Sequence, residues 1–170
     1  LGRTASVCVE IATGDEVVLI DNKNFKDYEH RNVFVVDSDM VMHIQTYLDT
    51  VREYARDGEL FVEYSLPIDH LTWEEGAEGT LDAHIVKGDE IIVIDLKFGH
   101  TPVKADCKQL KIYALAALEE YSILHDIQTV RLVISQPRVF DDPSEHIMTV
   151  DELLAFREEV EARAVEAASV

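Results

Sequence analysis

One stretch of this 170-residue sequence decides the fold: residues 79–113, GTLDAHIVKGDEIIVIDLKFGHTPVKADCKQLKIY. Two alternating apolar runs, residues 80–86 and 91–94, flank a turn in which Gly88 can adopt a positive φ at little cost. This pattern predicts a β-hairpin. A helical pattern then starts near Lys104 and continues to about residue 121.

The expected hairpin carries two aspartates where they can meet. Side chains alternate between the two faces of a strand, so Asp95 and Lys97 project to the same side. An antiparallel partner strand can bring Asp82 next to Asp95. Two carboxylates and the carbonyl of Leu96 form a hard oxygen site of the kind that Mg²⁺ or Mn²⁺ prefers. These residues therefore predict a site for one of these cations.

Three further polar side chains accompany the carboxylates. Lys97 supplies a positive charge that can orient a water nucleophile or stabilise charge developing on a phosphate. Gln109 and Tyr113 are four residues apart on the expected helix, so they share one face. Both can form hydrogen bonds to a phosphate or to a neighbouring site residue.

The order and spacing of these residues resemble the signature of the PD-(D/E)XK nuclease superfamily. More narrowly, they resemble its RecB-like and Cas4-like exonuclease branch, whose motifs are G-x-x-D, D-x-K and Q-x-x-x-Y. Within that branch the resemblance is strongest to a phage-borne group of unknown function, and it covers about residues 36–167. The matching segments are GTLD at 79–82, IDLKFG at 94–99, QLKIYAL at 109–115 and QPR at 136–138.

This resemblance implies an α/β fold with an αβββαβ core, in which helices flank a mixed central sheet. It implies a metal-dependent deoxyribonuclease, an exonuclease of phage or mobile-element recombination and repair, acting on the ends of single- or double-stranded DNA. Asp82, Asp95 and the Leu96 carbonyl would hold Mg²⁺ or Mn²⁺. Lys97 would position the water and stabilise the transition state, and Gln109 and Tyr113 would orient Lys97 or the phosphate.

One departure from the family leaves an alternative open. The first helix of the branch reads G-T-x-x-H-x-x-x-E, with a metal-binding histidine, and the nearest alignment here is residues 2–10, with Ser6 at the histidine position. Either the metal is held without a histidine, or the site is weakened. In the second case the chain would be a non-catalytic module that binds DNA ends or a recombination partner protein.

Composition sets limits on the partners. The net charge of −19 argues against a general nucleic-acid binder. Locally, however, residues 97–111 hold four lysines and a single acid, Asp106. We expect phosphate to approach here through Lys104, Lys108 and Lys111, although a solvated helix face is an equal alternative for these three.

Length and hydropathy indicate one domain, with a helical N-terminal part over about 1–57, a catalytic core over about 58–136 and a C-terminal helix over about 149–167. No apolar run reaches the roughly 18 residues of a membrane span, and no signal peptide is visible. With two cysteines, the simplest compartment is a reducing cytoplasm, that of the host cell if the gene is phage-borne. Many relatives continue into a cysteine cluster that binds an iron–sulfur centre, and we expect no such cluster in this chain.

The remaining segments frame this core. Residues 4–13 fit either a helix or a buried strand, Asp37 or Ser38 is expected to cap a helix that ends before Gly58, and residues 60–68 alternate as a strand. Glu63 within that strand is either a solvated side chain or an additional metal ligand. We expect a loop at 71–77, a strand at 129–135, a loop at 136–144 and a last helix capped by Thr149 or Asp151.

Overall fold

The computed structural model describes residues 7–11, 17–21 and 33–168, and it divides into two compact units with a boundary between Thr46 and Tyr47. In the N-terminal unit, strands β1 (Val7–Ile11), β2 (Val17–Asp21) and β3 (Val33–Val36) form an antiparallel sheet in the order β2-β1-β3. The prediction of a helical N-terminal part is wrong for these three segments. They are rich in β-branched valine and isoleucine, which favour a strand.

The same strands bear on the family motif expected at residues 2–10. Its last four residues lie in β1 rather than in a helix, so the helical alignment is not supported. Ser6, which occupies the histidine position in that alignment, lies outside the described residues. The first helix of the structure is α1 (Ser38–Tyr54), and its N-terminus is capped as expected, since the Asp37 carboxylate accepts a hydrogen bond from the Met40 N–H at 2.8 Å.

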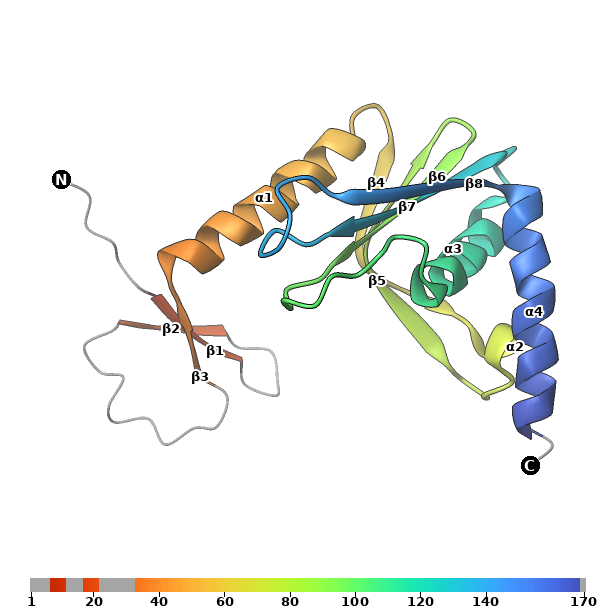
Figure 1. Ribbon diagram of the computed structural model, residues 1–170, viewed down its shortest axis with the longest axis horizontal. Coiled ribbons are helices and arrows are strands. Elements are labelled where there is room, and N and C mark those ends of the chain that lie inside the picture. The colour runs from red at the N-terminus through yellow and green to blue at the C-terminus, as the bar shows by residue number, and fades with distance from the viewer. Residues whose placement is uncertain (1–6, 12–16, 22–32, 169–170) are drawn as a thin grey trace. The chain divides into compact units, whose positions relative to one another are not determined.

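The C-terminal unit is built on a five-stranded mixed sheet in the order β4-β5-β6-β7-β8 (Figure 1). Strands β6 and β7 are parallel, and the other neighbouring pairs are antiparallel. The prediction of an α/β fold with a mixed central sheet flanked by helices is therefore confirmed. The strands are β4 (Glu59–Pro67), β5 (Glu78–Lys87), β6 (Glu90–Leu96), β7 (Thr129–Ser135) and β8 (Ser144–Thr149).

The hairpin forms as the sequence predicts. Strands β5 and β6 pair through to Lys87 and Glu90, and Gly88 in the turn between them has a φ of 61°. Strand β8 was not predicted. It is short, and Met148 is its one buried residue, so it has no apolar alternation that would indicate a strand.

Helices cover both faces of this sheet. Helices α3 (Lys108–Tyr121) and α4 (Val150–Ala168) contribute to the larger hydrophobic cluster, together with Leu81 and Val86 of β5 and alternate residues of β6 and β7. The opposite face carries a smaller cluster, in which Val51 and the half-buried Tyr47 and Tyr54 of α1 pack against the other residues of these strands. The nearly unbroken apolar runs of β6 and β7 follow from this arrangement, because a strand buried on both faces has no solvent side.

Helix α3 begins later than predicted, and one of the two capping residues predicted for helix α4 is found at its N-terminus. Helix α3 begins at Lys108 rather than near Lys104, because Cys107 before it is extended, with φ −110° and ψ 154°. Helix α4 is capped by Thr149: its hydroxyl accepts a hydrogen bond from the Glu152 N–H at 3.2 Å, and the Glu152 carboxylate accepts one from the Thr149 N–H at 2.8 Å.

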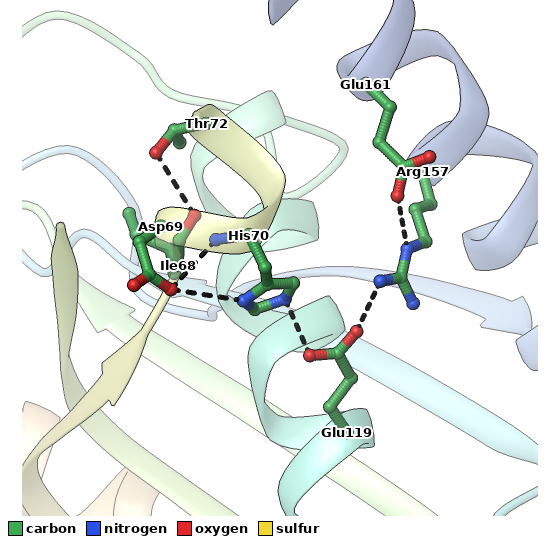
Figure 2. Close-up of polar contacts among 7 residues, drawn as sticks. All are labelled: Ile68, Asp69, His70, Thr72, Glu119, Arg157 and Glu161. Atoms are coloured by element: carbon green, nitrogen blue, oxygen red, sulfur yellow. Dashed lines mark hydrogen bonds and ion pairs between the residues drawn. The ribbon is translucent and has the colours of Figure 1, made fainter. Parts of the chain in front are cut away.

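A short helix, α2 (Asp69–Thr72), extends into the segment 71–77 that was expected to be a loop. A polar network ties α2 to the long helices α3 and α4 (Figure 2). The Glu119 carboxylate of α3 lies 2.6 Å from Nε2 of His70 in α2 and 2.6 Å from a guanidinium nitrogen of Arg157 in α4. Arg157 also donates to Glu161, one turn further along α4. These contacts help to fix α3, which carries Gln109 and Tyr113.

Candidate active site

The two predicted aspartates lie side by side where the β5–β6 hairpin opens. The pairing of these strands ends at Ala83 and Ile94, and Asp82 and Asp95 are the next residue on each strand. Oδ2 of Asp82 accepts a hydrogen bond from the Leu96 N–H at 2.8 Å. The Asp82 side chain thus reaches across to the strand end that carries Asp95.

Asp95 is a buried carboxylate, with 5% of the residue exposed. Burial raises the pKa of its carboxyl group above the ordinary value, the ammonium group of Lys97 opposes this shift, and the negative charge of Asp82 adds to it. Nζ of Lys97 lies 2.8 Å from Oδ2 of Asp95 in an ion pair. A carboxylate in these surroundings is stabilised by any further cation that binds beside it.

A chain of hydrogen bonds connects Lys97 to helix α3. Nζ of Lys97 donates to Oε1 of Gln109 at 3.0 Å, and Nε2 of Gln109 donates to the Tyr113 hydroxyl at 3.1 Å. Gln109 and Tyr113 lie on one helix face, as their spacing predicts. The structure therefore brings Asp82, Asp95, Lys97, Gln109 and Tyr113 into one connected cluster.

Gly79, three residues before Asp82, makes room for this arrangement. A Cβ atom added to Gly79 would lie 2.7 Å from Cε1 and 3.0 Å from Cδ1 of the Tyr113 ring, closer than such atoms approach in proteins. The glycine of the G-x-x-D motif and the tyrosine of the Q-x-x-x-Y motif thus touch each other. Their contact sets how closely α3 approaches β5, and with it the position of Gln109.

The donors present fit a magnesium-type site with few protein ligands. Within residues 33–168 and the two preceding strands, no three histidine, cysteine, aspartate or glutamate side chains gather as a metal centre. Mg²⁺ is commonly held by one or two carboxylates, with water and substrate phosphate completing its shell. Asp82 and Asp95 meet that requirement. Leu96, the third predicted ligand, is fixed beside them by the bond from its N–H to Asp82.

Tyr47 near the carboxylates was missed by the sequence interpretation. Burial raises the pKa of its hydroxyl group, and the negative charges of Asp82, Glu63 and Asp95 raise it further. The hydroxyl is therefore a neutral hydrogen-bond donor close to these acids. The sequence gives no signal of this, because a tyrosine whose ring packs on a sheet follows the same pattern as any other buried aromatic residue of a helix.

Glu63 of β4 is exposed and has a φ of 48°, which is uncommon for a residue other than glycine. In the pairing of β4 with β5, Val62 lies opposite Ala83 and Tyr64 lies opposite Leu81. Glu63 and Asp82 lie between these two pairs. The carboxylate of Glu63 acts on Tyr47 together with the two aspartates. Its role as an additional ligand stays a prediction.

The three lysines expected to meet DNA have different surroundings. Lys104 is exposed and lies in the loop before α3, so it does not continue a helical row with the other two. Lys108 is exposed, with Nζ 4.0 Å from a Glu159 carboxylate oxygen. Lys111 forms an ion pair with Asp106 and lies over the Phe156 ring, 5.4 Å from its centroid.

The rest of the chain adds two observations. None of the helices in the described segments is long and apolar enough to cross a membrane.

A family model described as a protein of unknown function, DUF2800, matches residues 6–170, which is nearly the whole sequence. The chain therefore belongs to the DUF2800 family.

Proposed function

We propose that this protein is a metal-dependent deoxyribonuclease of the PD-(D/E)XK superfamily, in its RecB-like and Cas4-like branch. It would hydrolyse phosphodiester bonds as an exonuclease in phage or mobile-element recombination and repair. The observation that carries the proposal is the connected cluster at the open end of the β5–β6 hairpin, in which Asp82 and Asp95 adjoin a lysine held by Gln109. The family description states no activity, so the proposal rests on this site.

The order of elements supports the superfamily assignment. Reading α1, β4, β5, β6, α3 and β7 along the chain gives the order αβββαβ, the same order as in the core that the resemblance implies, with the four-residue α2 between β4 and β5. The two carboxylates lie on the second and third strands of this order, Lys97 directly follows the third strand, and Gln109 and Tyr113 lie on the next helix.

In the proposed mechanism Asp82, Asp95 and the Leu96 carbonyl would hold Mg²⁺ or Mn²⁺. When bound, the cation supplies Lewis acidity and makes water a stronger nucleophile near neutral pH. Lys97 stabilises the negative charge that grows on the phosphate as the reaction proceeds. Gln109 holds the Lys97 ammonium group through Oε1, and Tyr113 fixes the Gln109 amide from its other side, so these two are positioning residues.

The acidic composition is compatible with a DNA substrate if contact is local. Lys97 partly offsets the negative charge of the two aspartates, and a cation at the site would offset it further. Lys104 and Lys108 are exposed close to this region in sequence and add positive charge. DNA binding should therefore be weak, aided by divalent cations and reduced by salt.

The test uses end-labelled single- and double-stranded DNA with Mg²⁺ or Mn²⁺, and compares the parent chain with Asp95→Asn. The matched control is Asp89→Asn, which makes the same chemical change at an exposed position in the β5–β6 turn. We expect cleavage by the parent and the control, and none by Asp95→Asn.

Two results would count against the proposal. Equal cleavage by Asp95→Asn would remove the hairpin from the active site. If the parent cleaves no DNA with either cation, the non-catalytic module that binds DNA ends or a recombination partner protein replaces the nuclease.

A further inference from the structure

A pocket of about 540 Å³ lies between the two loops that follow β6 and β7. These strands are parallel, so both loops leave the same edge of the sheet, where Lys97 also lies. The Lys97 N–H donates to the Ser135 carbonyl at 2.9 Å and extends the β6–β7 pairing to the start of the loops. The pocket is thus built from chain that begins at the candidate site.

One glutamine, Gln136, holds both walls of this pocket. It is buried, with 2% exposed, and its side-chain amide accepts a hydrogen bond from the Val103 N–H at 3.0 Å and donates to the carbonyls of Gly99 and Thr101 at 2.8 Å each. Its backbone carbonyl accepts hydrogen bonds from the N–H groups of Val139 and Phe140, each at 3.0 Å. The pocket is therefore formed before any ligand arrives, which lowers the cost of binding.

The lining combines a flat apolar surface with a few polar groups. Phe140 is 45% exposed, and Pro102 and Pro143 are also among the apolar walls. The polar groups include the ammonium group of Lys104 and the carboxylates of Asp141 and Asp142. An exposed aromatic ring in a pocket of this size is a surface on which a planar ligand can stack.

The charges indicate which planar ligand fits. Lys104 attracts a phosphate, whereas the two aspartates repel phosphate and accept hydrogen bonds from amino groups such as those on the edges of adenine, cytosine and guanine. A nucleotide satisfies both demands, with its base beside the aspartates and its phosphate at Lys104. In a duplex, stacking covers both faces of an internal base and pairing occupies its Watson–Crick edge. An unpaired base offers both a free face to Phe140 and free amino groups to the aspartates.

We propose that this pocket binds an unpaired nucleobase of single-stranded DNA, stacked on Phe140, beside the candidate active site. The inference rests on the proposed nuclease function and adds a substrate class to it, namely single-stranded or frayed ends. It also gives the Gln136-Pro137-Arg138 segment a role in building the pocket. Arg138 contributes through a hydrogen bond to the Phe98 carbonyl at 3.2 Å and a position over the Phe98 ring.

The test measures binding without divalent cation, so that cleavage does not interfere. The probes are a single-stranded oligonucleotide of about a dozen nucleotides with 2-aminopurine near one end, and a blunt duplex of the same sequence. The proteins are the full chain and its variants Phe140→Ala and Phe140→Tyr, with Ile123→Ala as a control that removes an exposed apolar side chain elsewhere. Thermal unfolding of each variant checks that it folds, which is expected because Phe140 is exposed.

We expect the parent to prefer the single strand and to quench 2-aminopurine fluorescence. Phe140→Ala should weaken single-strand binding roughly tenfold and abolish quenching, because stacking on an aromatic ring is lost. Phe140→Tyr and the control should behave as the parent. The inference is overturned if the parent does not bind the single strand, if Phe140→Ala binds it equally well, or if that variant loses duplex binding to the same extent.

Cleavage with Mg²⁺ or Mn²⁺ separates this inference from the proposed function. Quenching that depends on Phe140 in a parent chain that cuts no DNA would support the pocket and end the nuclease proposal. Cleavage that is unchanged in Phe140→Ala would support the nuclease and end the pocket proposal.

Discussion

The contact between Gly79 and the Tyr113 ring gives the sharpest stability prediction. In Gly79→Ala the new methyl group would lie 2.7 Å from Cε1 of Tyr113, so the ring or helix α3 must shift. Overpacking of this kind costs about 1–3 kcal/mol in free energy of unfolding. The shift also disturbs the bond between Tyr113 and Gln109, so any catalytic rate should fall with stability.

A second substitution isolates the clash. In a Tyr113→Ala background the ring is gone, and the next atom near the new methyl group is Cγ2 of Ile68 at an ordinary 3.5 Å. Gly79→Ala should then stabilise by about 0.4–1 kcal/mol, because alanine restricts the unfolded chain. The effect of one mutation thus changes sign, and the coupling energy between the two positions is about 1.5–4 kcal/mol.

Urea unfolding of the four proteins of this cycle, followed by circular dichroism, measures each free energy. Gly99→Ala serves as the matched control, since an added Cβ there meets no atom within 4 Å and should alter stability by less than about 0.5 kcal/mol. If Gly79→Ala costs the same with and without the Tyr113 ring, the proposed packing of α3 on β5 is wrong.

Three further predictions concern His84, Gln136 and Glu119. Burial lowers the pKa of His84 to about 4, so between pH 6.5 and 4 the unfolded chain takes up a proton at this position that the folded chain does not. The contribution of His84 to the free energy of unfolding should therefore be constant above pH 6.5 and fall by about 3 kcal/mol by pH 4. Urea unfolding of His84→Phe should lack this part of the fall. Gln136→Ala should destabilise by about 2–4 kcal/mol in the same assay, because it removes three hydrogen bonds inside the protein, and a cost below 0.5 kcal/mol would contradict them. Glu119→Ala should lower the free energy of unfolding by only about 1 kcal/mol, because its ion pairs to α2 and α4 are partly exposed. A fall in Tm much larger than a few degrees would contradict this small contribution.

Much of the core could be predicted because its signals are local. The hairpin has two apolar runs on either side of a glycine turn, and the spacing of Gln109 and Tyr113 places both on one helix face. The features that were missed depend on tertiary contacts. Tyr47 faces the carboxylates only because α1 packs on the sheet, and Lys111 is engaged by Asp106 and Phe156 in a way that no sequence spacing reveals.

The errors at the N-terminus and at α3 have a common physical origin. Short apolar runs such as Val7–Ile11 suit a helix or a strand equally, and pairing with neighbouring strands decides between them. Residues 104–107 suit a helix by composition, but Gln136 holds the preceding loop, and Cys107 is extended where the helix could have begun earlier.

The proposal that the hairpin cluster is a nuclease active site is tested most directly by one variant, Lys97→Ala. Its single-turnover rate of DNA cleavage is compared with that of the parent, and the Mn²⁺ affinity of both proteins is measured by calorimetry. In the proposed mechanism Lys97 acts on charge that develops in the transition state, and its removal leaves Asp82 and Asp95 in place. We expect a cleavage rate lower by roughly 10²-fold or more, with Mn²⁺ binding largely retained. Cleavage by Lys97→Ala at the parent rate would show that the hairpin cluster is not the active site.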